Sequence, residues 1–159
     1  MRVRFLIMCA IVIMGVSCKK DSQGNNILGT KMSATIDGKA WDSAIRTTVL
    51  QTNSNTFIIT ATSLTGEILE VTTYGSTQGT YELSVGSVNA KCLGTYKASI
   101  SSGTSDIYIS TSGTVVLNKV DKTAKKISGT FVFSLYCLNS LTPKTVTNGV
   151  FNDLSYTEQ

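Results

Sequence analysis

The sequence predicts an all-β protein with a single antiparallel domain, either a β-sandwich or a small up-and-down β-barrel of about 8–10 strands. Three observations support this fold class. Threonine and serine are abundant, and β-branched and aromatic residues recur in short runs. Apolar and polar residues alternate within those runs, and turn residues separate the runs at close spacing. No segment keeps the spacing of an amphipathic helix for long enough to predict one.

The first 17 residues differ from the rest of the chain and are predicted to be a signal peptide for export. Arg2 and Arg4 precede an apolar run over residues 5–16, and no charged residue interrupts that run. The run is shorter than the about 20 apolar residues that a transmembrane helix needs. A segment of the folded core is the less favoured alternative, because such a run without charges is typical of a signal.

Cys18 is predicted to carry a lipid. Residues 15–17 (GVS) precede it and the polar residues 19–21 follow it, an arrangement that resembles a bacterial lipobox. In that motif the cysteine is acylated, with palmitate among its fatty chains, and becomes the first residue of the mature protein. Gly15 stands where the commonest pattern has leucine. The alternative is an ordinary cleaved signal with an incidental cysteine. A lipobox implies a lipid anchor in the bacterial cell envelope, at the outer membrane, on its periplasmic or surface face.

Residues 18–30 are predicted to form the acylated cysteine and a flexible tether, and residues 31–159 one all-β domain. The tether is polar and contains glycine and asparagine, and a random-coil chain of this length spans on the order of 20 Å. No second shift in composition and no clear internal repeat follows, so a second domain is not expected.

The strands are predicted in order from this alternation. Met32, Ala34 and Ile36 alternate with polar neighbours, and Asp37-Gly38 is a strong signal for a two-residue hairpin turn. The return strand covers residues 40–51. The later strands are predicted over residues 56–62, 67–74, 80–85, 92–100, 106–110, 114–120, 127–137 and 144–156.

The same alternation gives each strand a buried face and a solvated face. In residues 127–137, Phe131, Phe133 and Leu135 share one parity, and mostly polar side chains have the other. Antiparallel sheets commonly meet water in this way. The pattern does not distinguish a sandwich, which side chains fill, from a barrel that holds a ligand cavity.

Cys92 and Cys137 both have the apolar parity of their strands, and export would place them in an oxidising compartment. They are therefore disulfide candidates, and a bridge between them would stabilise the fold by roughly 4 kcal/mol. Buried thiols are the alternative. A catalytic thiol is not expected, because the sequence has no histidine to serve as its base.

The sequence predicts no enzyme, no catalytic residue, no metal site and no cofactor. The absence of histidine removes Ser-His-Asp and Cys-His sites and imidazole zinc ligands. The acidic residues are scattered, and Glu67 and Glu70 fall on opposite faces of one strand. Once Arg2 and Arg4 leave with the signal, 12 of the 14 Lys and Arg remain against 10 Asp and Glu. This weak positive charge predicts no nucleic-acid partner.

The aromatic residues give a weaker indication of ligand binding. Trp41 follows the first hairpin and is expected to close one end of the core. Tyr108 and Tyr136 lie opposite to the apolar parity of their strands, which makes them the best candidates for exposure. Exposed tyrosines stack on sugars and other flat ligands, but ordinary packing on the strands is the favoured interpretation. No ligand-binding residue is assigned.

Three segments together resemble a known family: residues 34–41 (ATIDGKAW), 126–131 (KISGTF) and 147–153 (TNGVFND). They resemble an uncharacterised DUF-type family of envelope lipoproteins common in Bacteroidota. The resemblance covers nearly the whole mature domain and assigns no catalytic residues. The glycines of these segments are predicted to have structural roles: Gly129 opens a bulge, and Asn148-Gly149 bends or bulges the last strand.

These observations favour a lipid-anchored binding or interaction module of the envelope without catalytic activity. Its membrane contact would be the N-terminal lipid, and its partner a glycan, a peptide or an envelope protein. Two alternatives remain: a structural or assembly lipoprotein that contacts another envelope protein, and a lipocalin-like carrier of a small ligand.

Overall fold

The computed structural model describes residues 32–86, 88–99 and 106–159, so the predicted signal peptide, Cys18 and the tether lie outside the described residues. The described strands are β1 (Met32–Ile36), β2 (Lys39–Gln51), β3 (Thr56–Ser63), β4 (Ile68–Thr73), β5 (Gly79–Leu83), β6 (Cys92–Lys97), β7 (Ile107–Asp121), β8 (Lys126–Cys137), β9 (Thr142–Ser155) and β10 (Thr157–Glu158). Within the described ranges, no helix has the length and apolar character needed to cross a membrane.

The strands close into an antiparallel barrel, which confirms the all-β prediction and decides between its two forms. Around the barrel the order is β1, β2, β3, β4, β6, β7, β8 and β9, and β9 pairs with β1 again. Within this ring of eight, each strand pairs with the next ring strand along the chain, as in an up-and-down barrel. Outside this ring, β5 pairs with β7, and β10 pairs in parallel with β2.

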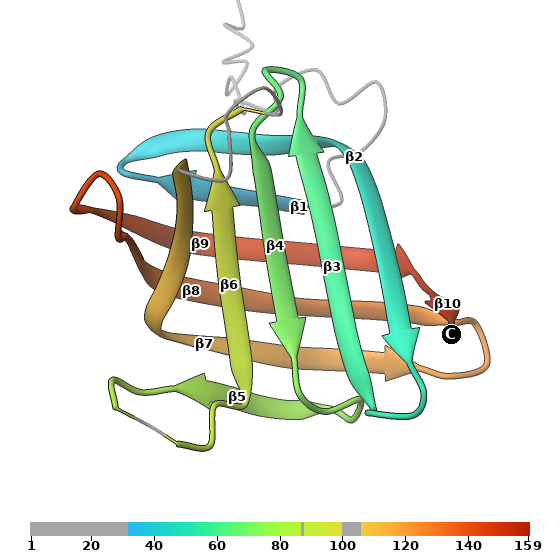
Figure 1. Cartoon of the computed structure of the whole chain (residues 1–159). Coiled ribbons are helices and arrows are strands. Elements are labelled where there is room, and N and C mark those ends of the chain that lie inside the picture. Colours follow the sequence, from blue (N-terminus) through green and yellow to red (C-terminus); the bar gives the residue numbers. More distant parts are fainter. Residues whose placement is uncertain (1–31, 87, 100–105) are drawn as a thin grey trace, which may run out of the picture.

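The barrel is flattened into two layers whose strands cross (Figure 1). β3, β4 and β6 run along one layer, and β1, β8 and β9 run across the other. β2 and β7 belong to both layers: β2 pairs first with β1 and then with β3, and β7 pairs first with β6 and then with β8. Each of these strands has a register shift at its corner, between Ser43 and Ile45 in β2 and between Ser110 and Ser112 in β7. Bulges of this kind let a strand turn a corner.

The corner in β7 corrects two expectations. The sequence predicted separate strands over residues 106–110 and 114–120, but one continuous strand covers both. The face predicted to be buried in residues 106–110 was also wrong. Ile109 is 47% exposed, whereas Ser110 is buried, and its Oγ accepts a hydrogen bond from the Gly94 N–H at 2.9 Å. The bulge shifts the alternation by one residue, so parity counted across it fails.

Two further register shifts bend β9. One lies opposite residues 131–133 of β8 and contains Asn148, with a positive φ of 52°. The other lies opposite residues 127–129 and contains Asp153, with a positive φ of 45°. The predicted bulge at Asn148-Gly149 is therefore present. At Gly129 the register shifts on the pairing with both neighbouring strands, but the extra residues lie in β7 and β9, so Gly129 stands opposite bulges instead of opening one.

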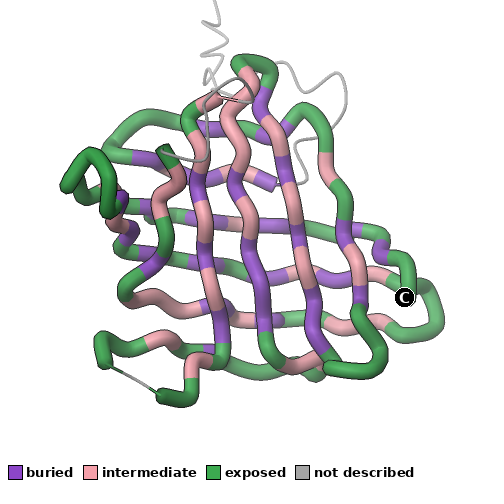
Figure 2. Tube along the Cα trace, in the orientation of Figure 1, coloured by how far each residue is buried: buried purple, intermediate pink, exposed green. Residues whose placement is uncertain are grey.

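Large side chains fill the interior of the barrel. Figure 2 shows buried and more exposed residues alternating along the strands of both layers. Phe57, Phe131, Phe151, Met32 and Ile59 are among the largest fully buried side chains. Glycines on the inward face make room for the rings, because several of them lie directly beneath a phenylalanine. The core therefore resembles the filled interior of a small barrel.

Candidate functional site

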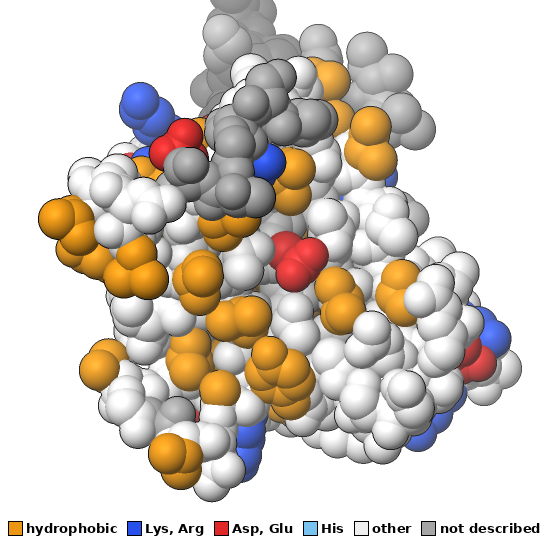
Figure 3. Space-filling view, in the orientation of Figure 1, with side chains coloured by type: hydrophobic (Ala, Val, Ile, Leu, Met, Phe, Trp, Pro, Cys, Tyr) orange, Lys and Arg blue, Asp and Glu red, His pale blue; other side chains and the backbone are white. Residues whose placement is uncertain are grey.

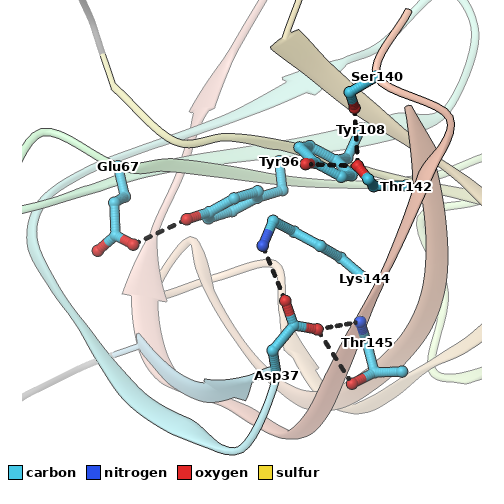
Figure 4. A network of polar contacts seen from close by, with 8 residues as sticks. All are labelled: Asp37, Glu67, Tyr96, Tyr108, Ser140, Thr142, Lys144 and Thr145. Carbon is cyan, nitrogen blue, oxygen red and sulfur yellow. Dashed lines mark hydrogen bonds and ion pairs between the residues drawn. The ribbon is translucent and has the colours of Figure 1, made fainter. Parts of the chain in front are cut away.

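Polar side chains gather at the end of the barrel that holds the β1–β2 and β8–β9 turns (Figures 1 and 4). We call this group the polar end and define it by Asp37, Glu67, Tyr96, Tyr108 and Lys144. Asp37 lies in the β1–β2 turn, Glu67 precedes β4, Tyr96 ends the inward face of β6, and Tyr108 and Lys144 lie near the starts of β7 and β9.

Local sequence explains the position of Asp37. Asp37 and Gly38 form a two-residue turn in which both have positive φ, at 48° and 78°, and Ile36 pairs with Lys39. This geometry is that of a type I′ turn, for which Asp-Gly is a preferred sequence. Because β1 also pairs with β9, the turn lies beside Thr145, and the Asp37 N–H donates to the Thr145 carbonyl at 3.0 Å.

The Asp37 carboxylate holds Lys144 in place. Its Oδ2 lies 2.8 Å from Lys144 Nζ, and its Oδ1 accepts from the Thr145 N–H at 2.8 Å. Burial alone would raise the pKa of Asp37, but the hydrogen bonds from Lys144 and Thr145 and the lysine charge together lower it below its usual value. The Lys144 side chain is only 22% exposed. The ion pair is therefore more shielded than an ordinary surface pair.

Two tyrosine rings flank the same lysine. Lys144 Nζ lies 5.0 Å from the centre of the Tyr108 ring and 5.6 Å from that of Tyr96, within cation–π range. The two rings meet edge to face, with centroids 6.0 Å apart. The Tyr108 hydroxyl shares a hydrogen bond of 2.9 Å with Thr142 Oγ1. Lys144 is thus held from three sides in one geometry.

Glu67 is fixed by hydroxyl groups rather than by a cation. Its Oε1 accepts from the Tyr96 hydroxyl at 2.7 Å, and its Oε2 accepts from Thr65 Oγ1 at 2.9 Å and from Ser63 Oγ at 3.2 Å. Burial would raise the pKa of Glu67, but these hydrogen bonds and the charge of Lys144 together outweigh it and lower the pKa. Burial, and then the neighbouring carboxylate, raise the pKa of Tyr96.

A small cavity of about 140 Å³ opens among these residues. Its lining consists of Ile36, Asp37, Lys39, Ala40, Trp41, Glu67, Tyr96 and Lys144. Trp41, the only tryptophan, is 3% exposed, and its indole N–H has no hydrogen-bond partner among the described residues. The wall therefore combines two carboxylates, two ammonium groups and two aromatic rings.

The pKa shifts at the polar end keep its groups in fixed protonation states near neutral pH. The lowered pKa values of Asp37 and Glu67 keep both carboxylates ionised near neutral pH, and the raised pKa of Tyr96 keeps its phenol protonated. A general acid or base works best with a pKa near the operating pH. These three groups instead present fixed donors, acceptors and charges.

The two disulfide candidates are not joined to each other, and Cys137, which pairs with Thr142 beside the β8–β9 turn, lies at the same end of the barrel as the polar end. Both are buried, at the start of β6 for Cys92 and the end of β8 for Cys137. Burial raises the pKa of the Cys92 thiol to about 11, whereas hydrogen bonds from Ser140 lower the pKa of Cys137. The arrangement corresponds to the alternative of buried thiols. Cys18, the predicted lipid attachment site, lies outside the described residues.

The aromatic expectations have mixed outcomes. Trp41 is buried at one end of the core, as predicted. Tyr136 is half-buried on the outer face of β8. Tyr108 is also half-buried, but it packs against the core and Tyr96 instead of standing exposed, because the parity of β7 is reversed before its bulge.

Sequence reasoning did not find Asp37, Glu67 and Lys144 as a group. One signal was available for two of them. Glu67 has the parity of the buried Leu69, and Lys144 has the parity of the buried Val146. A charged residue on the inward parity at the start of a strand indicates a polar barrel end. Their proximity depends on barrel closure, which the alternation does not give.

Comparison with known proteins identifies a family but no function. A family model described as a domain of unknown function, DUF6252, matches residues 29–155, which include β1 to β9. No curated protein and no solved structure matches the chain. Because the family match covers most of the chain and the whole barrel, the protein belongs to the DUF6252 family.

Proposed function

We propose that this protein is a lipid-anchored binding module of the bacterial cell envelope without catalytic activity. The N-terminal signal and the lipobox-like residues before Cys18 support the anchor, which would lie at the outer membrane. The resemblance to Bacteroidota envelope lipoproteins points to the same compartment. The membrane contact is then the acylated Cys18, and the barrel is the part that meets a partner.

The polar end is the observation that best supports a binding role. Asp37, Lys144 and Glu67 are held in fixed positions around a cavity at one end of the barrel. Charged groups that a fold holds in fixed positions around a cavity often mark a functional site. A closed barrel is a rigid support for such a group, and fixed donors and acceptors lower the entropy cost of binding.

The filled core gives less support to the lipocalin-like carrier. A carrier of that kind needs an apolar cavity inside the barrel, whereas Phe131, Phe133, Phe151 and their neighbours occupy the described interior. The cavity at the polar end is small and partly charged.

A specific observation favours the second candidate, an assembly lipoprotein that docks on another envelope protein. Val49, Ile58 and Leu93 lie in one row across β2, β3, β4 and β6 on the outer face, with Thr72 between the last two. All three are half-buried, and Tyr74 nearby is 49% exposed. Figure 3 shows apolar side chains over this face of the molecule. Apolar patches of this kind occur at protein interfaces.

The anchor is tested by metabolic labelling with a radioactive or alkyne-bearing palmitate analogue in the native bacterium. The wild-type protein is expected to carry the label and to sediment with the outer membrane, whereas Cys18→Ala carries none. Cys9→Ala is the matched control, because this second signal-peptide cysteine lies inside the apolar run. Unlabelled wild-type protein in the periplasmic fraction would refute the anchor.

Crosslinking in intact cells distinguishes a protein that docks on the outer face from a ligand that binds at the polar end. An assembly role predicts one stoichiometric protein partner whose crosslinks lie on the β2–β3–β4–β6 face and are lost in Ile58→Lys. The binding role predicts crosslinks, or protection of Lys144 from amine reagents, at the polar end, and no effect of Ile58→Lys on either.

A further inference from the structure

We infer that the cavity at the polar end binds a single sugar residue of a glycan. This inference rests on the proposed binding function and names the ligand class of the same site. It depends on one juxtaposition: a small cavity whose lining combines the held carboxylates of Asp37 and Glu67, the held ammonium group of Lys144, and the aromatic residues Trp41 and Tyr96.

The size of the cavity limits the ligand. Its volume is about 140 Å³, whereas pockets for drug-sized molecules have about 300–1,000 Å³. A cavity of this size holds several water molecules or one small ring. The ligand is therefore a single unit, and a longer molecule can place only its terminal residue here.

The charges of the wall favour a neutral ligand rich in hydroxyl groups. Asp37 and Glu67 balance Lys39 and Lys144, so the wall carries no net formal charge. Asp37 and Lys144 also pair with each other, at 2.8 Å. An ionic ligand would have to compete with that pair. A hydroxyl group both donates and accepts, so adjacent hydroxyls of one ring can satisfy a carboxylate and an ammonium together.

Glu67 retains capacity for such a contact. An ionised carboxylate offers about four acceptor positions, and Glu67 uses three of them for Tyr96, Thr65 and Ser63. The remaining position lies on a group whose orientation is already fixed. A ligand hydroxyl that donates to it would gain a charge-assisted hydrogen bond with little loss of side-chain entropy.

The aromatic part of the wall suits the apolar face of a sugar ring. Trp41 and Tyr96 both line the cavity, and rings with one polar tip commonly contact ligands that are partly apolar and partly polar. The Trp41 N–H is closed off from solvent and lacks an acceptor among the described residues. It becomes available to a ligand oxygen only if the wall shifts, and such a shift would relieve an unsatisfied buried donor.

The experiment uses the full-length lipoprotein purified in mild detergent, with its single tryptophan, Trp41, excited selectively as the fluorescent probe. Its emission is titrated with glucose, galactose, mannose, rhamnose, N-acetylglucosamine and the methyl glycosides, up to about 50 mM, which covers millimolar Kd values. At least one sugar is expected to give a saturable change in emission. Glycine, alanine and their dipeptides are titrated in parallel as the charged alternative.

The variant Glu67→Gln is expected to weaken sugar binding by about tenfold or more, because it removes the charge-assisted contact. Glu70→Gln is the matched control and is expected to leave the Kd unchanged. Glu70 lies three residues away on the outer face of β4, where it accepts from Thr60. Thermal unfolding of both variants shows whether the loss of binding follows from a loss of structure.

Three outcomes overturn the inference. They are the absence of a saturable response to any sugar, a sugar response that Glu67→Gln does not weaken, and a Glu67-dependent response to amino acids or dipeptides alone. The last outcome keeps a binding site at the polar end and removes only the sugar. If the wild-type protein carries no palmitate label but still responds to a sugar, the proposed lipid anchor is wrong and the sugar site stands.

Discussion

Asp37 combines a backbone role with an electrostatic one. Its positive φ makes the hairpin turn, its N–H and carboxylate bind the Thr145 backbone, and the carboxylate holds Lys144. Asparagine also adopts positive φ readily and keeps one carbonyl oxygen as an acceptor. The substitution Asp37→Asn therefore removes mainly the charge and leaves the turn.

We expect Asp37→Asn to lower the free energy of unfolding by about 1 kcal/mol, at the upper end of the range for partly exposed ion pairs. Asp153→Asn is the matched control, since Asp153 also has positive φ and pairs with Lys119, but at 3.3 Å and with both side chains more than half exposed. Its loss should stay below about 0.5 kcal/mol. Urea unfolding followed by Trp41 fluorescence measures both. Equal losses would show that the shielding of Lys144 contributes nothing.

The lowered pKa of Glu67 gives a prediction for acid stability. A carboxyl whose pKa is lower in the folded state than in the unfolded state stabilises the protein above its unfolded pKa. That contribution is lost as the pH falls through the folded pKa. The ordinary pKa of the group is 4.5, so the loss begins near that pH and continues below it.

Wild-type protein is therefore expected to lose more stability between pH 7 and pH 3 than Glu67→Gln does, because glutamine does not titrate. Urea midpoints at the two pH values provide the comparison. Asp42→Gln, at an exposed position of β2, is the control and should follow the wild type. If Glu67→Gln lost as much stability between pH 7 and pH 3 as the wild type does, the hydrogen bonds from Tyr96, Thr65 and Ser63 would not favour the ionised form of Glu67.

Glycine and phenylalanine from different strands fill the barrel as pairs. A Cβ atom added to Gly94 of β6 would lie 2.6–2.7 Å from three ring atoms of Phe133 in β8, and its nearest neighbours are all side-chain atoms. The ring therefore occupies the space that the missing side chain leaves. Alternation of small and large residues is the usual way to fill a small barrel.

Gly94→Ala is expected to destabilise the protein by about 1–3 kcal/mol through overpacking. Thr95→Ala, next to it on the outer face, should cost much less. If the clash with the ring is the cause, Phe133→Leu will be less harmful in the Gly94→Ala background than in the wild type. A double-mutant cycle from urea unfolding measures that coupling. Strict additivity would show that the backbone of β6, and not the ring, opposes the added methyl group.

The elements were largely predictable from alternation and turn residues, and the exceptions have a common cause. The hairpin at Asp37-Gly38 and the run over residues 127–137 follow from local pattern alone. β7 was divided in two because its bulge at residues 110–112 looks like a break in the alternation. A bulge is fixed by the corner between two layers, and that corner does not exist until the barrel closes.

The polar end was less predictable for the same reason. Asp37 and Lys144 are 107 residues apart in sequence and meet only because β9 returns to pair with β1. A reader of the sequence sees an aspartate in a turn and a lysine after the only proline, neither of which signals the other. Inward parity marks Glu67 and Lys144 as unusual, but closure of the sheet makes them neighbours.

At the level of the whole molecule, the two ends of the barrel differ in the side chains that they hold. β9 begins at the polar end and finishes at the opposite end, where the chain terminates (Figure 1). There Tyr156 is 4% exposed and meets Phe57 edge to face at 5.0 Å, and β10 adds to β2. The first end is polar and contains the cavity, whereas the second is sealed by an aromatic pair.

Substitution of Tyr156 tests this division. Tyr156→Ala should cost about 3 kcal/mol or more, as removal of a buried aromatic ring from a core usually does. Tyr156→Phe should be neutral or stabilising by up to about 1 kcal/mol, because the buried Tyr156 hydroxyl has no hydrogen-bond partner among the described residues. Tyr136→Ala, on the outer face of β8, is the control for loss of a ring that is only half-buried.

The same variants separate stability from binding. Because the sealed end lies at the far end of β9 from Lys144, the loss in Tyr156→Ala should add to that in Asp37→Asn within about 0.5 kcal/mol. Any Kd measured at the polar end should stay unchanged in folded Tyr156→Phe. A changed Kd in that variant, or strong coupling between the two substitutions, would mean that the barrel transmits strain from one end to the other. The filled core would then connect the two ends instead of serving as a rigid support for one of them.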